Sequence, residues 1–110
     1  MARIGARDLI ERVADPGSWM SWDGPPLPPR GVNGPADGRY VADLEAARAK
    51  TGLDESILTG EALIGGRRVA IVLGDFGFLA GSIGVAAAER LVLGIERATA
   101  ERLPLIAGPT

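Results

Sequence analysis

The sequence predicts an α/β fold preceded by an N-terminal helical arm. A continuous apolar run over residues 69–73 is typical of a strand that is buried on both faces. Gly65-Gly66, just before that run, is a two-residue turn of the kind that joins antiparallel strands. The Ala-rich segment 83–101 has the composition of a long helix. With a further apolar strand after the helix, this order indicates a layered unit in which a helix covers a sheet.

An amphipathic helix and an aromatic arm are expected at the N-terminus. Apolar residues recur at near-helical spacing in residues 1–14, with charged residues between them. Asp15-Pro16-Gly17 should end this helix, because proline cannot continue its hydrogen-bond ladder. The next segment, residues 18–22, is expected to be extended, with Trp19 and Trp22 anchoring it to a larger body.

The segment 23–37 is dense in Pro and Gly, and it predicts an exposed connector with polyproline character. A ligand for a proline-recognising domain is the functional alternative for this segment. The helix, the arm and this connector form the first predicted division of the chain, residues 1–37. Residues 38–110 form the second, which is expected to be the start of a larger domain.

The second division is expected to contain a helix, a hairpin, the long helix and a last strand. Asp37 is placed to cap a helix over residues 38–50, and Thr51-Gly52 to end it. Residues 56–64 and 67–73 are the two predicted strands of the hairpin. Residues 103–107 read as another buried strand. Its backbone donors and acceptors need partners, so we expect the chain to continue or another chain to supply them.

Composition excludes several classes of function. The chain of 110 residues has no Cys and no His, which excludes disulfides, thiolate metal sites, cysteine nucleophiles and Ser-His-Asp triads. A net charge of −2 gives no electrostatic reason for binding nucleic acid. No apolar run approaches the roughly 18 residues of a membrane span. We therefore expect no metal, no nucleic acid and no membrane partner, and the missing Cys fits a cytoplasmic location.

Four glycines, at positions 74, 77, 81 and 84, precede the long helix. Their spacing matches neither the dinucleotide-binding fingerprint nor a phosphate-binding P-loop. Exposed amides at the helix N-terminus could hold an anion, such as a phosphate or a developing enolate. The alternative is that small residues only let the helix lie close to the sheet.

Most charged residues are expected to be ordinary surface groups. Asp75 follows a buried strand and is expected to accept hydrogen bonds from turn amides, and the alternative is a buried carboxylate with a raised pKa. Arg67 and Arg68 could attract a phosphate, but we expect them to be ordinary surface charges beside the hairpin turn. The residues expected on solvated surfaces of the hairpin and the long helix are Glu61, Glu89, Arg90, Glu96, Arg97, Glu101 and Arg102.

Four segments, taken in chain order, resemble the beta-type carboxyltransferase subunits of acyl-CoA carboxylases. They are Asp15-Pro-Gly-Ser-Trp19, Thr59-Gly-Glu-Ala62, Asp75-Phe-Gly-Phe78 and Ala80-Gly-Ser-Ile-Gly84. The long helix and the strand after it are also similar, so the resemblance covers nearly the whole chain except the Pro-rich connector. Two departures stand out. Ala80 replaces the first glycine of the family's turn, and the four-Cys zinc ribbon of some bacterial members is missing.

The resemblance implies a partial crotonase-like fold, built from ββα units. It implies transfer of CO2 from carboxybiotin to the α-carbon of an acyl-CoA such as acetyl-CoA or propionyl-CoA. In this family, backbone amides of glycine pairs hold the thioester enolate and the biotin ureido oxyanion. Those glycine pairs are expected beyond Thr110, so this chain is expected to be an N-terminal portion that is inactive alone.

The resemblance also implies partners and a binding surface. The chain has no Met-Lys-Met biotinylation motif, so biotin is expected on a partner, the biotin carboxyl carrier or biotin carboxylase subunit. An oligomer with the remaining carboxyltransferase chain or subunits is expected. The candidate acyl-CoA-binding residues are Phe76, Phe78, Ala80, Gly81, Ser82 and Gly84.

Two alternatives to the carboxyltransferase remain open at this point. An acyl-CoA decarboxylase of the malonyl type would use the same fold and bind the same enolate. A non-catalytic assembly module would bind partner subunits and show no affinity for acyl-CoA.

Overall fold

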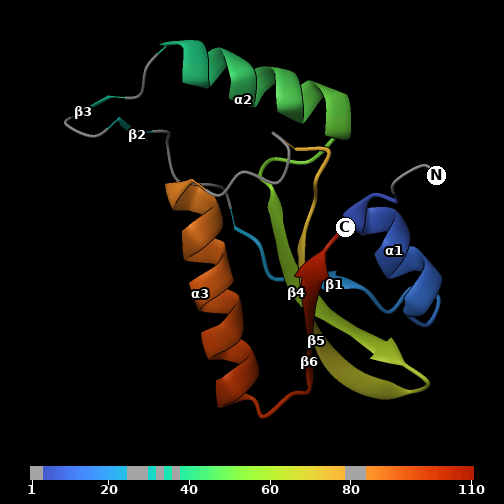
Figure 1. The fold of residues 1–110 in the computed structure, drawn as a ribbon. Coiled ribbons are helices and arrows are strands. Elements are labelled where there is room, and N and C mark those ends of the chain that lie inside the picture. Colours follow the sequence, from blue (N-terminus) through green and yellow to red (C-terminus); the bar gives the residue numbers. More distant parts are fainter. Residues whose placement is uncertain (1–3, 25–29, 32–33, 36–37, 79–83) are drawn as a thin grey trace.

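The fold is taken from a computed structural model, which describes residues 4–24, 30–31, 34–35, 38–78 and 84–110. Its centre is a four-stranded sheet in the order β1-β4-β5-β6, and a separate pair, β2-β3, lies in the connector. In Figure 1, α3 lies on one side of the sheet and α1 on the other. The helices of the described chain are α1 (Ala6–Val13), α2 (Gly38–Thr51) and α3 (Val85–Ala100). The strands are β1 (Met20–Ser21), β2 (Arg30–Gly31), β3 (Gly34–Pro35), β4 (Ile57–Ile64), β5 (Arg67–Gly74) and β6 (Leu105–Pro109).

The hairpin of β4 and β5 is confirmed with its glycine turn. The two strands pair antiparallel from Ile57 opposite Gly74 to Ile64 opposite Arg67. Gly65 and Gly66 have φ of 57° and 78°, which is the left-handed conformation that a tight hairpin turn needs at both central positions.

The turn of the hairpin is held by a residue from the N-terminal arm. Both carboxylate oxygens of Asp15 accept hydrogen bonds from it, one from the amide of Gly65 at 3.0 Å and one from that of Gly66 at 2.8 Å. Asp15, which lies just beyond the C-cap of α1, therefore also holds the turn end of the hairpin.

The aromatic arm runs along β4 as an extra strand, as expected from its sequence. Met20 lies opposite Glu61 and Ser21 opposite Gly60, and the amide of Trp22 donates to the carbonyl of Thr59 at 2.9 Å. The pairing is short, but the ring of Trp19 adds to it by lying against the backbone of Gly60. The arm is thus part of the folded unit.

Strand β5 is buried on both faces, which confirms the prediction from its apolar run. Val69, Ile71 and Leu73 belong to a core that includes Ile10 of α1. Val72 faces the other way and packs with Ala87 of α3. Alternate residues of one strand thus serve two separate clusters, because successive side chains of a strand point to opposite faces.

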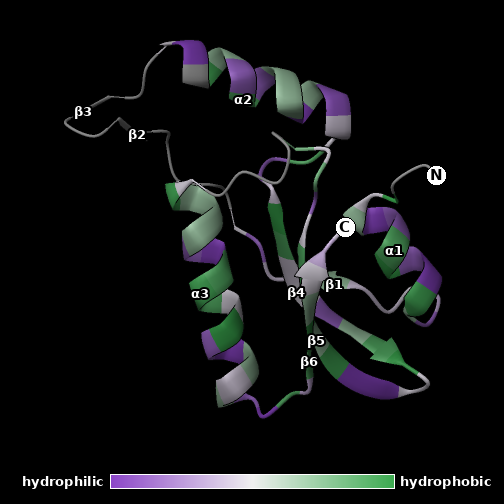
Figure 2. Cartoon of the chain, viewed as in Figure 1, coloured by the Kyte–Doolittle hydropathy of each residue, from purple (hydrophilic) through white to green (hydrophobic). Residues whose placement is uncertain are grey.

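Strand β6 differs from its prediction. It begins at Leu105, pairs parallel with β5 at the edge of the sheet, and leaves Leu105 and Ile106 exposed. The expectation of a buried strand was wrong for the described chain, because α3 packs on β4 and β5 and does not cover this edge. Figure 2 shows hydrophobic residues at the start of the strand as well as along β4 and β5.

The connector also differs in part from its prediction. Arg30–Gly31 and Gly34–Pro35 pair as two short antiparallel strands, where a polyproline segment was expected. Residues 25–29, 32–33 and 36–37, with the predicted cap Asp37, lie outside the described residues. Helix α2 is confirmed, with Leu44 and Ala47 buried and Gly52 ending it at a φ of 71°. The division of the chain at residue 37 stays a prediction.

Within the described ranges, no helix is both long and apolar enough to cross a membrane. Nor do the acidic side chains of those ranges form a cluster that could hold a metal ion.

Candidate functional site

The turn after β5 is fixed by hydrogen bonds from Asp75. Its Oδ1 accepts from the amide of Gly77 at 2.7 Å, and its carbonyl accepts from the amide of Phe78 at 3.2 Å. Its own amide donates to the carbonyl of Ser56 at 2.8 Å. The expectation that Asp75 bonds turn amides is confirmed.

Asp75 also makes a contact that sequence reasoning missed. Its Oδ2 accepts a hydrogen bond of 2.8 Å from the amide of Ala6, the first residue of α1. These two residues lie 69 positions apart in the chain. No local pattern connects them, so the contact follows only from the packing of α1 on the sheet.

The structure treats the candidate acyl-CoA residues differently from one another. Phe76 is 42% exposed, whereas Phe78 is fully buried in the core. The ring of Phe78 therefore supports the turn from inside and presents no surface to a ligand. Gly84 is the extended residue just before α3. Ala80, Gly81 and Ser82 lie outside the described residues.

Arg90 is buried among polar groups. The prediction that it lies on the solvated face of α3 was wrong. The side chain is 7% exposed and forms a two-pronged pair with Asp54, with both N–O distances at 2.7 Å. Its two terminal nitrogens also donate to the carbonyls of Ile57, at 3.2 Å, and of Gly24, at 2.8 Å. Its Nε lies 3.7 Å from Oδ1 of Asp23, which makes an ion pair.

The reason for this placement is the packing of α3 by small residues. The buried residues of the helix include Ala86, Arg90, Gly94 and Ala98, which follow one another at intervals of four. A Cβ added at Gly94 would lie 2.9 Å from Cγ2 of Thr59, so the helix touches the sheet there. Arg90 belongs to this inward row, and its long side chain reaches past the small residues to the loops at the end of the sheet.

The ion pair with Arg90 changes the acidity of Asp54. Burial lowers the pKa of Arg90, but the hydrogen bond to Asp54 and the charges of Asp23 and Asp54 outweigh burial and raise that pKa. The hydrogen bond from Arg90 holds the pKa of Asp54 below its usual value. The partners of Arg90 therefore favour its charged form.

A pH dependence of stability follows from the lowered pKa of Asp54. A carboxylate with a lowered pKa stabilises the folded state above its unfolded pKa, near 3.8, and this contribution is lost as the pH falls through its folded pKa. The side chain of Asp54 is 52% exposed, so screening keeps the effect to about 1 kcal/mol. We expect Asp54→Asn to be less stable than the wild type by this amount at neutral pH. Urea unfolding should show that the difference in stability between the two proteins disappears as the pH falls through the folded pKa of Asp54.

The control for this prediction is Asp43→Asn, because Asp43 is exposed on α2. It should unfold like the wild type at every pH. An Asp54→Asn variant that remains less stable than the wild type in acid would contradict the ionic origin of the effect.

A second polar group lies on the exposed face of the hairpin. Arg68 pairs with Glu61 at 2.5 Å and with Glu101 at 2.6 Å, and Arg97 pairs with Glu101 at 2.6 Å. The hydrogen bond from Arg68 lowers the pKa of Glu61. The guanidinium of Arg97 also lies 4.4 Å from the ring centre of Trp22. Arg68 is thus occupied by carboxylates, which supports its reading as a structural surface charge.

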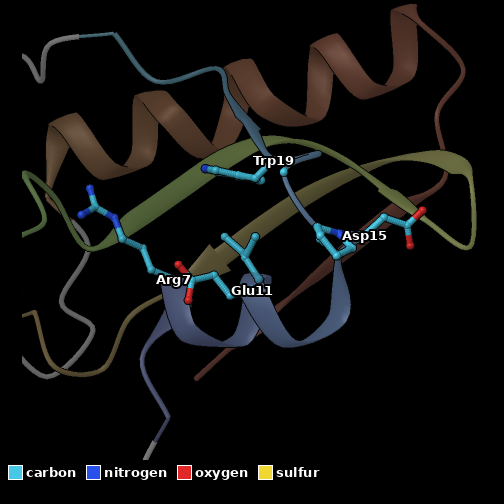
Figure 3. A pocket seen from close by; sticks show the side chains of 8 residues that line it. Arg7, Glu11, Asp15 and Trp19 are labelled. Atoms are coloured by element: carbon cyan, nitrogen blue, oxygen red, sulfur yellow. The ribbon is translucent and has the colours of Figure 1, made fainter.

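A cavity of about 640 Å³ lies between α1 and the aromatic arm. Figure 3 shows Arg7 and Glu11 projecting from α1 toward it, Trp19 beside β4 and Asp15 at the hairpin side. The remaining lining residues are Ile10, Ala14, Pro16 and Gly17. Both oxygens of Asp15 are already used by the hairpin turn, so the cavity offers mainly apolar surface with Arg7 and Glu11 at its rim.

Comparison with known protein families identifies the family of this chain. The family model described as the carboxyl transferase domain matches residues 37–110, which is well over half of the chain. The chain belongs to the carboxyl transferase domain family. This family assignment confirms the resemblance that the four sequence segments indicated.

Two curated relatives illustrate the similarity to carboxyl transferase domain proteins. The chain is 54% identical, over 110 residues, to a probable biotin-dependent acyl-coenzyme A carboxylase beta3 subunit of Mycobacterium tuberculosis. It is 43% identical, over 102 residues, to an acetyl-coenzyme A carboxylase carboxyl transferase subunit beta of Gloeobacter violaceus. These alignments cover 100% and 91% of this chain, but only 21% and 33% of the relatives. The chain thus spans between a fifth and a third of the length of these two relatives.

Solved structures show the same fold at lower sequence identity. A structure of transcarboxylase 12S superposes with a TM-score of 0.74 at 20% identity, over 98% of this chain and 20% of the other. A single-chain, multi-domain long-chain acyl-CoA carboxylase superposes with a TM-score of 0.69 at 21% identity, over 96% of this chain and 10% of the other. The fold is therefore the predicted one, a part of the crotonase-like carboxyltransferase domain.

Proposed function

We propose that this chain is the N-terminal part of an acyl-CoA carboxyltransferase subunit. The whole protein would transfer a carboxyl group to an acyl-CoA such as acetyl-CoA or propionyl-CoA. The single observation that carries this proposal is the family match over residues 37–110. The beta3 subunit named above aligns with the chain over its whole length.

The proposed role of the described residues is to bind and orient the acyl-CoA. The turn at 75–78 leaves the carboxyl end of β5, where ligands commonly bind in α/β proteins. Phe76 offers half-exposed aromatic surface there. Gly84 is the residue just before α3 and has no side chain, so it leaves the amides at the N-terminus of the helix accessible to a ligand. With Ala80, Gly81 and Ser82, these residues are the proposed wall of the acyl-CoA site.

The catalytic amides are proposed to lie in the part of the domain beyond this chain. Carboxybiotin on a carrier partner would supply the carboxyl group that is transferred. The sole lysine of this chain, Lys50, lies in α2 outside any biotinylation motif, which supports biotin being carried by the partner.

Exposed apolar side chains support an assembly with further chain or subunits. Val85, Val92 and Leu93 of α3 are each more than half exposed, and Leu105 and Ile106 are exposed on the edge strand β6. Large exposed apolar side chains are typical of surfaces that are covered in an assembly. An oligomeric, cytoplasmic enzyme of fatty acid metabolism is the setting that this proposal predicts.

The test uses the full-length protein with biotin carboxylase and biotinylated carrier subunits, ATP and radiolabelled bicarbonate. We expect acid-stable label in the acyl-CoA product, dependent on the carrier and abolished by avidin. Release of CO2 from malonyl-CoA without any biotin partner would establish the decarboxylase alternative instead. An absence of acetyl-CoA binding in isothermal titration, with the partners present, would establish the assembly module.

The proposed wall of the site is tested separately by Phe76→Ala. We expect the KM for acyl-CoA to rise about fivefold, with the KM for the carboxylated carrier unchanged, because only one substrate loses contact surface. Val13→Ala is the control, since Val13 has similar exposure on α1. Equal kinetics for both variants would remove Phe76 from the wall.

A further inference from the structure

Asp75 is buried at the start of the turn that carries Phe76, and its side chain accepts hydrogen bonds from two different parts of the chain. The side chain is 6% exposed. A carboxylate is expensive to bury unless its oxygens accept hydrogen bonds. Here one oxygen accepts from Gly77 in the turn and the other from Ala6 in α1.

The turn is held at two points, one on each side of the backbone of Phe76. The carboxylate of Asp75 holds the amide of Gly77, and the ring of Phe78 is fully enclosed in the core. Phe76 lies between Asp75 and Gly77, and it is the residue of the turn whose ring is turned outward. The anchoring of its two neighbours therefore helps to fix the backbone position of Phe76.

Glycine at two positions allows this arrangement. A Cβ added at Gly77 would lie 2.9 Å from Oδ1 of Asp75, which is too close for a carbon and an oxygen to remain in place. A Cβ at Gly5 would lie 3.5 Å from Oδ2, in ordinary contact. The carboxylate thus fits closely between the turn and the start of α1.

Helix α1 depends on the same carboxylate. The residue before the helix is Gly5, which provides no side-chain cap, and Asp75 supplies the capping oxygen from a distant part of the chain. A negative charge is favourable at this end of a helix. One side chain therefore connects the N-terminal arm with the turn that follows β5.

We infer that Asp75 is a positioning residue for acyl-CoA binding, which holds the turn 75–78 against α1 so that Phe76 keeps its orientation. This inference rests on the proposed function, because Phe76 is assigned to the acyl-CoA site only there. Asp75 would act on acyl-CoA binding through Phe76. Helix α1 would then support the site as well, because it is bonded to Asp75.

The test compares Asp75→Asn and Asp75→Ala in the full-length protein with its carboxylated carrier. Asn keeps the size but has one acceptor oxygen, and Ala removes both. We expect the KM for acyl-CoA to rise about threefold for Asn and about tenfold for Ala. The KM for the carrier should stay within about twofold, because the displaced turn is proposed to contact only the acyl-CoA. Hydrogen exchange at Ala6 and Gly77 should speed up in both variants.

The matched control is Asp15→Ala. Asp15 also accepts hydrogen bonds from two amides, but these belong to the hairpin turn at the other end of β5. This variant should lose stability with no change in the KM for acyl-CoA. An equal rise in that KM for Asp15→Ala, or a parallel change of both KM values in Asp75→Asn, would show that Asp75 is only structural.

The failure of this inference is distinguishable from that of the proposed function. If the wild type transfers carboxyl groups and Asp75→Asn binds acyl-CoA normally, the positioning role is wrong and the function stands. If the wild type transfers none, both are wrong. Should Asp75→Ala fail to fold, the milder Asp75→Asn, with its exchange measurement, decides alone.

Discussion

Replacing Arg90 with methionine is expected to destabilise the protein by roughly 3 kcal/mol, the cost of breaking a buried ion pair from one side. The variant keeps most of the side-chain volume and removes the charge. Asp54, being half exposed, can turn toward water after the loss. Asp23 cannot do so, because its side chain is only 11% exposed and its oxygens accept from the amide and hydroxyl of Thr59. The cost therefore comes mainly from Asp23, left nearly buried without a counter-charge.

Urea unfolding of the intact protein at neutral pH measures this effect. Arg12→Met is the control, because Arg12 is exposed on α1, and it should unfold within about 0.5 kcal/mol of the wild type. Arg90→Lys should recover only part of the loss, since one ammonium cannot meet Asp54 and two carbonyls in the geometry of a guanidinium. If Arg90→Met were as stable as the control, the pair would contribute nothing net to folding.

The sequence allowed the elements with local signals to be predicted. Gly65-Gly66 sets the hairpin by its backbone conformation, and the apolar run of β5 reports burial on two faces. The glycine pair and the apolar run both lie within the elements that they predict. The α/β order and the family resemblance follow from such signals, and they are confirmed.

Contacts between distant elements could not be predicted in the same way. Arg90 looks solvated by charge alone, and only its interval of four from Ala86, Gly94 and Ala98 indicates the inward row of α3. That row was missed because Arg90 was assigned to the solvated face by its charge, whereas the side chains that face the sheet are mainly small ones. The bond between Asp75 and Ala6 depends on how α1 packs, and no spacing in the sequence reports it.

The candidate site was therefore predicted in part. The turn, its position before α3 and the local bonds of Asp75 follow from residues 74–78 themselves. The burial of Phe78 does not follow from the sequence. Phe76 and Phe78 are the same residue type with one residue between them, so only the packing of the core determines which ring is buried. Leu105 and Ile106 show the converse case, in which apolar residues predict burial while the edge of the sheet leaves them exposed.

Replacing Gly60 with valine is expected to release the aromatic arm and destabilise the protein by about 3 kcal/mol, at the upper end of overpacking effects. A Cβ at this position would lie 2.4 Å from Cη2 of Trp19 and 2.5 Å from the carbonyl oxygen of Met20. The oxygen belongs to the backbone of β1, so the clash cannot be relieved by turning a side chain. The arm must therefore leave β4, which also loses the pairing of Ser21 with Gly60.

Tryptophan fluorescence measures the release directly, because the chain contains two tryptophans and both lie in the arm. We expect Gly60→Val to shift the emission to longer wavelength, since Trp19 leaves the core and Trp22 leaves Arg97. Gly108→Ala is the matched control: a Cβ there meets nothing within 4 Å, so emission and stability should stay unchanged. A Gly60→Val protein with native emission would mean that β4 moves instead of the arm. The docking of the arm would then be stronger than the pairing of β4 with β5 beside it, which the eight paired residues of that hairpin argue against.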